Sequence, residues 1–183
     1  MSQVIEFGIP GTEMPGHWFT PLEISQVVSF VETLGRVPPQ KVAGDPARGA
    51  ALYAGKGACS NCHTLNGRGG ALGPDLTGIG ASRSPSYLRE SLIEPEAAVP
   101  EGFLQLELLT RDGRRIQGVR VNEDTFSIQI RDLAGNFHSF FRSELQKINK
   151  QPGKSPMPSY KSEFTSSELD DLIAYLDSLR GNP

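Results

Sequence analysis

The stretch Cys-Ser-Asn-Cys-His at residues 59–63 constrains this chain more than any other part, because it contains both of the chain's cysteines. The histidine follows the second cysteine directly, and a glycine-rich segment follows the histidine. A disulfide across two intervening residues would be strained, and it would leave the histidine without a role. The sequence therefore requires an explanation for two thiols and an imidazole that lie side by side.

This pattern has one specific chemical use, the covalent attachment of a haem. The two thiols add to the vinyl groups of the haem, and the imidazole is held where it can bind the iron from one face. A thioredoxin-like dithiol would need a βαβ context, whereas a predicted helix precedes this motif and a loop follows it. A structural zinc site would need four ligands, and the other histidines, His17 and His138, are isolated in the sequence. The pattern therefore favours a haem bound through Cys59 and Cys62, with His63 as an axial ligand.

A low-spin electron carrier needs a second axial ligand, and methionine is one that raises the reduction potential. Of the three methionines, Met1 is terminal and Met14 belongs to a segment without a cysteine motif. Met157 is flanked by Pro156 and Pro158, which favours a rigid loop, although a methionine can also fill a gap in a core. We expect Met157 to be the second ligand.

Four other residues have weaker signals. An imidazole that binds a metal usually donates its other ring N–H to a carbonyl, which fixes the tautomer. The turn at Gly73 and Pro74 could supply that carbonyl, or it could be an ordinary surface turn, and the spacing leaves both interpretations open. We expect His17 to be a loop residue and His138 to be a strand residue that faces solvent.

Two segments near opposite ends of the chain repeat one pattern. In residues 21–34 and 166–179 the apolar positions recur at three- and four-residue steps, which is typical of an amphipathic helix. The two segments align without a gap, a Met-Pro pair lies upstream of each, and Gly35 is a predicted stop for the first. Each begins with a threonine followed three residues later by a glutamate, the pattern of a capping box: Thr20 and Glu23, then Thr165 and Glu168.

The rest of the chain is organised around these helices. Residues 37–44 are rich in proline and glycine and predict a linker. Asp45 and Ser84, each followed by a proline, predict the starts of two short helices. Period-two alternation between turn residues in 103–141 predicts four short antiparallel strands, which lie in an insertion at about 103–150. We therefore expect a mainly α chain with a small four-stranded antiparallel β insertion.

Apart from the sheet, residues 45–183 resemble class I c-type cytochromes, and with the sheet they resemble the planctomycete-type haem-binding domain. The resemblance rests on the cysteine motif, on "GPDLTGIG", on "SPMPSY" and on the final helix. It implies the cytochrome c fold with one covalently bound haem c and its iron. It also implies that Pro74 accepts a hydrogen bond from His63, that Met157 is the sixth ligand, and that a helix with Gly49 and Tyr53 crosses the final helix.

The predicted domains follow from this resemblance. Residues 45–183 would be the cytochrome c domain with its β insertion, and 37–44 would be the linker. Residues 1–36 resemble the methionine loop and last helix of a preceding cytochrome c-like unit without its haem-attachment half; the alternative is an N-terminal arm. The apolar face of this helix is expected to pack on the domain or to mediate self-association.

We expect a periplasmic or otherwise extracytoplasmic protein, because covalent haem attachment in this family takes place outside the cytoplasm. It would transfer single electrons and would not be an enzyme, since six-coordinate iron leaves no open position for a substrate. Leu76, Tyr87 and Leu88 are expected to enclose the porphyrin. The expected partners are redox proteins such as a dehydrogenase, an oxidase or other cytochromes, and the chain would be part of a larger multi-haem or dehydrogenase-linked protein.

Two other functions are compatible with the motif. A five-coordinate haem enzyme or gas sensor would place a polar group such as His138 near the iron. An adaptor would bind an acidic partner through residues 103–161, which contain ten basic and six acidic residues. A net charge of −3 gives no uniform basic field for nucleic acid. We also expect no membrane span, because no apolar run reaches the roughly 18 to 20 residues that a span needs.

Overall fold

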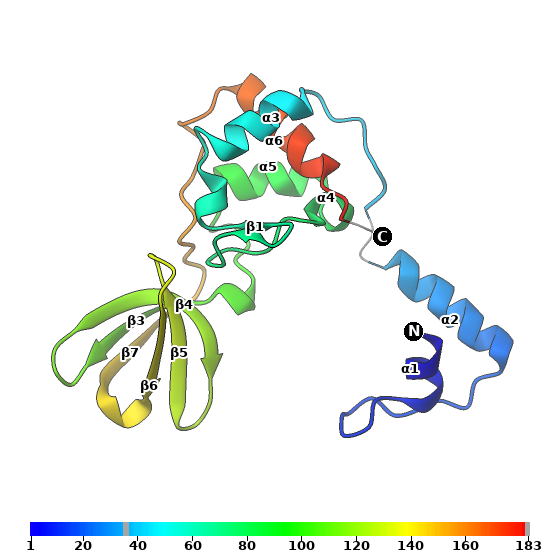
Figure 1. Cartoon of the computed structure of the whole chain (residues 1–183), viewed down its shortest axis with the longest axis horizontal. Helices are drawn as coiled ribbons and strands as arrows, with labels where there is room; N and C mark the ends of the chain where they lie inside the picture. The colour runs from blue at the N-terminus through cyan, green and yellow to red at the C-terminus, as the bar shows by residue number, and fades with distance from the viewer. Residues whose placement is uncertain (35–36, 182–183) are drawn as a thin grey trace. The chain divides into compact units, whose positions relative to one another are not determined.

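The computed structural model of the chain describes residues 1–34 and 37–181 (Figure 1). Its contacts divide the chain into two units, Met1–Pro38 and Pro39–Pro183. The division falls within the proline-rich stretch that the sequence indicates as a linker. Each unit is described by itself below.

The first unit contains α1 (Ser2–Phe7) and α2 (Pro21–Thr33), which contact each other. The capping box predicted for α2 is confirmed, because Glu23 accepts the Thr20 N–H at 2.7 Å and its own N–H donates to the Thr20 hydroxyl at 3.3 Å. Ile5 of α1 and Ile24 of α2 are the buried apolar side chains of this unit in the described residues. The predicted stop at Gly35 lies outside the described residues, and α2 ends at Thr33.

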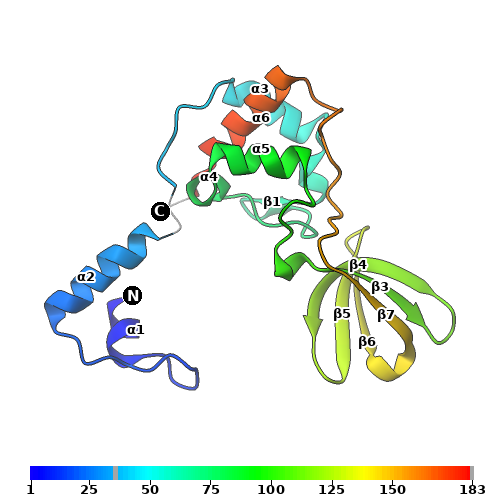
Figure 2. The same cartoon turned by 180° about the vertical axis from the view of Figure 1, so that it is seen from behind.

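The second unit has a helical part and a larger β-sheet, which Figure 2 shows from behind. Both predicted helix starts are confirmed: the Asp45 carboxylate accepts the Ala47 N–H at 2.8 Å, and the Ser84 hydroxyl accepts the Tyr87 N–H at 3.3 Å. The elements of the helical part are α3 (Pro46–Ala54), the 3-10 turn η1 (Cys59–Asn61), β1 (Thr64–Leu65), β2 (Arg68–Gly69), α4 (Ile79–Ser82), α5 (Pro85–Ile93), the 3-10 turn η2 (Glu101–Phe103) and α6 (Ser166–Ser178).

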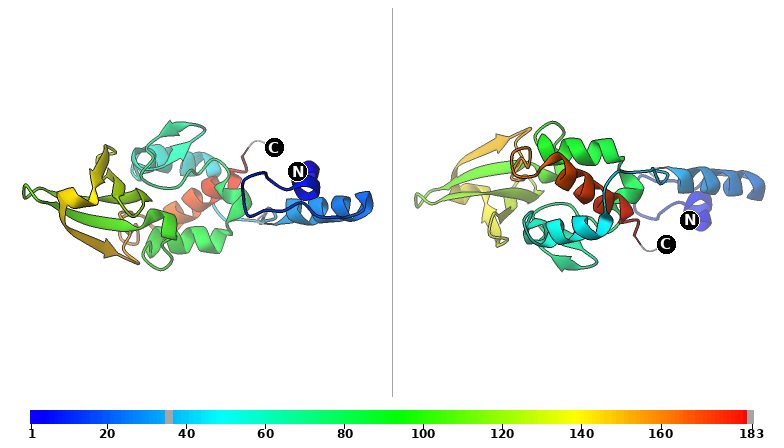
Figure 3. Two further views of the ribbon diagram at one scale, coloured as in Figure 1. Left: turned by 90° about the horizontal axis from the view of Figure 1, so that it is seen from below. Right: turned by 90° about the horizontal axis from the view of Figure 1, so that it is seen from above.

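The helices α3 and α6 lie against each other, as the views from below and above also show (Figure 3). Gly49 makes this close approach feasible, because an added Cβ would collide with the Asp171 carbonyl oxygen and would lie 2.7 Å from the Tyr175 Cβ. The Arg48 guanidinium binds the Asp171 carboxylate, with 2.7 Å between Nε and Oδ2. The buried side chains of this core are Tyr53, Cys59, Leu76, Leu88, Leu92, Phe164, Leu169, Leu172, Ile173 and Leu176.

The β insertion forms one antiparallel sheet with the strand order β6-β5-β4-β3-β7. Side chains alternate across it, so that one face buries Leu106, Leu108, Ile128, Ile130, Phe140 and Leu145 as a second core. The strands are β3 (Gln105–Thr110), β4 (Arg115–Glu123), β5 (Ser127–Asp132), β6 (Phe137–Phe141) and β7 (Leu145–Gln151), and the 3-10 turn η3 (Arg142–Glu144) connects the last two.

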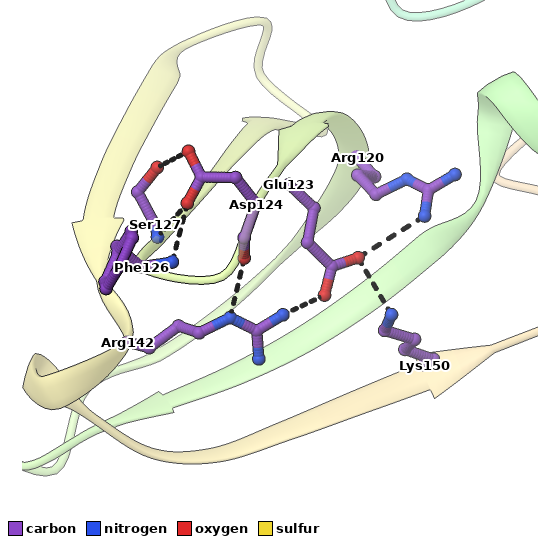
Figure 4. A network of polar contacts seen from close by, with 7 residues as sticks. All are labelled: Arg120, Glu123, Asp124, Phe126, Ser127, Arg142 and Lys150. Atoms are coloured by element: carbon purple, nitrogen blue, oxygen red, sulfur yellow. Dashed lines mark hydrogen bonds and ion pairs between the residues drawn. The ribbon is translucent and has the colours of Figure 1, made fainter.

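A carboxylate surrounded by cations lies on the sheet (Figure 4). Glu123 of β4, whose side chain is 9% exposed, accepts from Arg120 at 3.3 Å and from Lys150 of β7 at 2.8 Å, and it also pairs with Arg142. These hydrogen bonds, that of Lys150 first, lower the pKa of Glu123. The pairs tie the non-neighbouring strands β4 and β7 together and attach η3 to them.

Two predictions about the fold are wrong. The described structure is 35% helical and 22% strand, so the chain is not mainly α. The sheet has five strands instead of four, because residues 145–151 pair with β3 although only Leu145 and Ile148 carry the apolar pattern there. The physical reason for the first error is that the insertion buries a core of its own and so forms a full second layer of structure.

Replacing Gly49 by alanine should lower the free energy of unfolding by about 1–3 kcal/mol, because the new Cβ would push α3 away from the Asp171 carbonyl. This cost exceeds the roughly 0.5–1 kcal/mol that alanine gains over glycine inside a helix. Gly102→Ala is the matched control, since nothing lies within 4 Å of its added Cβ. Urea unfolding of the two variants measures the difference, and equal stabilities would contradict the role given to Gly49.

Candidate haem-attachment site

The cysteine motif follows α3 directly and is folded into a single tight turn. The chain leaves α3 through Gly55 and Gly57, and η1 begins at Cys59 after Ala58, which has a left-handed φ of 47°. The N–H groups of Cys62 and His63 both donate to the Cys59 carbonyl, at 3.2 and 2.9 Å. Side chains three positions apart eclipse each other in a 3-10 turn, so the two thiols lie on the same side.

The two cysteines are free thiols, and Cys59 is buried in the helical core. Burial raises the pKa of the Cys59 thiol to about 11, because the thiolate would lose its solvation. A dithiol redox centre needs a cysteine whose pKa is lowered. The environment of Cys59 therefore argues against a thioredoxin-like function and suits a thiol that becomes a buried thioether.

The His63 ring is oriented by the loop that follows it. Nδ1 lies 2.8 Å from the Pro74 carbonyl oxygen. A carbonyl only accepts, so Nδ1 carries the proton and Nε2 keeps the lone pair that a metal requires. Burial lowers the pKa of His63, which favours the neutral, ligating form of the imidazole. The loop packs this closely because residue 73 is a glycine, whose added Cβ would lie 2.6 Å from the His63 Cε1.

The other predicted site residues are placed as follows. Leu76 and Leu88 are buried in the same core as Cys59, and Met157 is partly buried and packs against that core. Tyr87 is not part of this core; its ring lies 5.1 Å from the guanidinium carbon of Arg83. The structure thus brings Leu76, Leu88 and Met157 together in one core with Cys59, and it places Tyr87 in the first turn of α5, against Arg83.

The other two histidines lie outside this core. His17 belongs to the first unit, where its ring stacks on Phe19 with 5.3 Å between ring centroids. His138 lies on β6 with Nε2 2.8 Å from the Asp132 Oδ2, and its side chain is 30% exposed. It is therefore a half-buried residue that is hydrogen-bonded to Asp132, and the expectation that it faces solvent is wrong. The pattern missed this because Asp132 is six residues away, on the preceding strand.

Sequence reasoning missed the anchoring role of Tyr160 in the methionine loop. Its hydroxyl donates to the Gly57 carbonyl at 2.8 Å, and its N–H donates to the Leu92 carbonyl at 2.8 Å. The neighbouring Ser159 hydroxyl donates to the Ile93 carbonyl at 2.6 Å. These bonds fasten the methionine loop both to the attachment turn and to the end of α5. The only signal in the sequence is that Ser159 and Tyr160 follow the Met-Pro pair.

A pocket of about 460 Å³ lies beside the motif. Tyr53 lines this pocket, and its buried hydroxyl has no hydrogen-bond partner in the described residues. Its lining residues are Tyr53, Ser60, Leu65, Asn66, Arg68 and Gly69. An orphaned buried hydroxyl, two thiols on one side of a turn and an imidazole with a free Nε2 fit a haem. Among residues 1–34 and 37–181, no group of three or more His, Cys, Asp or Glu side chains is arranged for a metal ion.

No helix in the described part of the chain is both long and apolar enough to cross a bilayer.

Replacing Gly73 by alanine should push the His63 ring away from Pro74 and destabilise the fold by about 1–3 kcal/mol, because the added Cβ has no room beside the ring. We also expect less haem per protein after maturation, measured by the ratio of haem absorbance to protein. Gly78→Ala in the same segment is the control, since its added Cβ would meet neighbours only at 3.9 Å. Equal haem content in both variants would contradict this role of Gly73.

Comparison with known proteins agrees with this geometry. Residues 46–104 match the family model described as Cytochrome c, a stretch that includes Cys59, Cys62, His63 and Pro74 and ends before β3. No curated protein matches the chain. A cytochrome c domain is therefore present, and this family implies covalently bound haem c with its iron, electron transfer and redox partner proteins.

Proposed function

We propose that residues 45–181 form an electron-transfer unit with one covalently bound haem c, for which His63 and Met157 would be the two protein ligands of the iron. The observation that carries this proposal is the 2.8 Å contact between His63 Nδ1 and the Pro74 carbonyl, next to two free thiols. When bound, the haem supplies an iron that gains and loses one electron. Cys59 and Cys62 hold it, and Pro74 keeps the His63 Nε2 directed at it.

Met157 is supported as the second ligand by the way its loop is held. Its own N–H donates to the Ser155 hydroxyl at 3.1 Å, and the bonds of Ser159 and Tyr160 fix the following residues. A loop fastened at both sides presents its side chain in one position, which a ligand requires. Leu76 and Leu88 exclude water from the same core, which favours the less charged state of the iron and, with the thioether, a higher potential.

The unit is proposed to be a carrier and not an enzyme, since two protein ligands would leave the iron without an open position. The five-coordinate alternative would use His138 as a distal group. His138 is bound to Asp132 on the sheet, whose core is separate from the one that contains Cys59. This placement favours the six-coordinate carrier.

The partners are proposed to be redox proteins such as a dehydrogenase, an oxidase or other cytochromes. The ten basic and six acidic residues of 103–161 favour an acidic partner for the sheet. In addition to these charged residues, the sheet region has three exposed phenylalanines: Phe126, Phe137 and Phe141 are 77%, 51% and 65% exposed. Aromatic side chains are enriched at protein interfaces. The sheet is therefore proposed to be the partner-facing part of the second unit.

The chain is proposed to act in the periplasm or another extracytoplasmic compartment, where haem c is attached in this family. Residues 1–36 are proposed to be the methionine-loop and last-helix part of another cytochrome c-like unit. The protein would then belong to a larger multi-haem or dehydrogenase-linked assembly. The repeated capped helix supports this proposal.

Protein matured in a host that attaches haem c should give a pyridine haemochrome spectrum typical of two thioether bonds and an intact mass larger by one haem. The chain has only two cysteines and one attachment motif, so we expect one haem. Cys59→Ser and Cys62→Ser should each remove one thioether bond. Colourless material with both thiols free would refute the proposed function.

Met157→Ala should open the sixth position of the iron and lower the reduction potential, because the thioether ligand is lost. The reduced variant should bind about one carbon monoxide per haem, whereas the parent protein should bind almost none. Met14→Ala is the matched control, since Met14 lies in the first unit. An unchanged visible spectrum in Met157→Ala would remove Met157 from the ligand set.

A further inference from the structure

The two units contain the same capped helix. Thr20 and Glu23 exchange hydrogen bonds of 2.7 and 3.3 Å at the start of α2, and Thr165 and Glu168 exchange bonds of 2.8 and 3.3 Å at the start of α6. The helices have equal length, and their apolar positions align without a gap. The elements that pack against α6 therefore indicate which elements could pack against α2.

The likeness extends to the helix that precedes each methionine loop. In the second unit, the loop is bound to α5 through the N–H of Tyr160, which donates to the Leu92 carbonyl at 2.8 Å. In the first unit, the loop after Met14 is bound to α1 through the N–H of His17, which donates to the Ile5 carbonyl at 3.2 Å. Since α1 contacts α2 as α5 contacts α6, α1 takes the part of α5.

In the first unit, residues 1–34 contain no helix that corresponds to α3. Leu176 of α6 is 6% exposed, whereas its counterpart Val31 is 36% exposed. Two more apolar residues, the aromatic Phe30 of α2 and Leu34 at the end of the helix, are 63% and 56% exposed. On α6 the residue that lies against α3 is Tyr175, whose ring centroid is 5.5 Å from that of Tyr53, and its counterpart on α2 is Phe30. The exposed apolar side of α2 therefore includes the position that α3 covers on α6.

The charges around α6 and α2 indicate which kind of helix would fit against the exposed side of α2. α3 and the turn after it are basic toward α6, because Arg48 binds Asp171 at 2.7 Å and Lys56 binds Glu168 at 2.9 Å. The first unit has Glu23 at the position of Glu168, and residues 1–34 contain four glutamates and no lysine or arginine. A basic helix complements this surface, whereas a second copy of the acidic first unit would be repelled.

We propose that the side of α2 formed by Val27, Phe30, Val31 and Leu34 is the docking site for a basic helix of the α3 type. The helix would have a glycine at the crossing and would lead into a Cys-x-x-Cys-His turn, so the partner is the haem-attachment half of a second cytochrome c-like unit. This inference rests on the proposed function of the chain. Beyond that function, the inference names the surface that binds the partner and the chemical character that the partner must have.

The test uses the full, haem-loaded chain and a probe made from the chain itself, the haem-bearing fragment of residues 45–80, which is used once circular dichroism has shown that α3 is helical in it. This fragment contains α3, the cysteine motif and the Pro74 loop. We expect it to bind at a ratio of one to one in isothermal titration. It should also quench the fluorescence of Trp18, the chain's single tryptophan, which lies fully exposed just before Thr20.

Val31→Asp should weaken binding of the fragment by at least about tenfold, because docking would bury an unpaired carboxylate. Thr33→Asp is the matched control: the residue is also β-branched and in the last turn, but its counterpart Ser178 is exposed on α6. A fragment with Gly49→Val should also fail to bind, since the added side chain prevents the close crossing seen on α6. Circular dichroism of both chain variants checks that α2 remains helical.

Equal binding to the Val31→Asp and Thr33→Asp chains, or none to the parent chain, would overturn the inference. A dimer of the chain alone that Val31→Asp abolishes would also overturn it, because the occupant would then be a second copy. In each of these cases a chain that still carries one redox-active haem leaves the proposed function intact. Colourless protein would refute the proposed function first.

Discussion

The close crossing of α3 and α6 supports the rest of the haem-attachment site. Gly49 lets the two backbones approach, and Arg48 of α3 pairs with Asp171 of α6 at the same crossing. Because the cysteine motif begins five residues after α3 ends, this crossing sets where the thiols lie. The methionine loop leads into α6 and is bound to the same region through Tyr160 and Gly57. One helix pair therefore positions both sides of the site, although its members lie more than a hundred residues apart in the sequence.

The sheet, like the helical part, has to bury its apolar side chains, and it does so separately within the same chain. Its strands bury their own apolar face, and the Glu123 network joins β4 to β7 at the edge of that core. The helical core and the sheet core share no buried side chain in the described residues. The surface of the insertion can therefore differ without disturbing the residues that are proposed to hold a haem. This separation is consistent with a division between an electron-carrying part and a partner-facing part.

Local signals account for what could be predicted. A cap needs only a threonine and a glutamate three positions apart, and the helix starts at Thr20, Asp45, Ser84 and Thr165 were all predicted correctly. β7 was missed because its pairing with β3 depends on residues some forty positions away, and its own pattern has two apolar positions. α1 was missed for a different reason, since a six-residue helix has too few turns to show a period. The share of the structure that the sheet forms was underestimated, and the predicted fold class was therefore wrong. The reason is that strand patterns do not reveal whether a face is buried.

The sequence by itself determined the chemistry of this protein: two thiols and an imidazole in one turn, a methionine between prolines, and two copies of one capped helix. These features depend on neighbours in the chain, so they can be read from residue order. Only the tertiary structure decided which polar groups anchor the methionine loop and which of the two helices is covered. Those outcomes depend on contacts between distant segments, and a contact of that kind exists only once both segments have folded against each other.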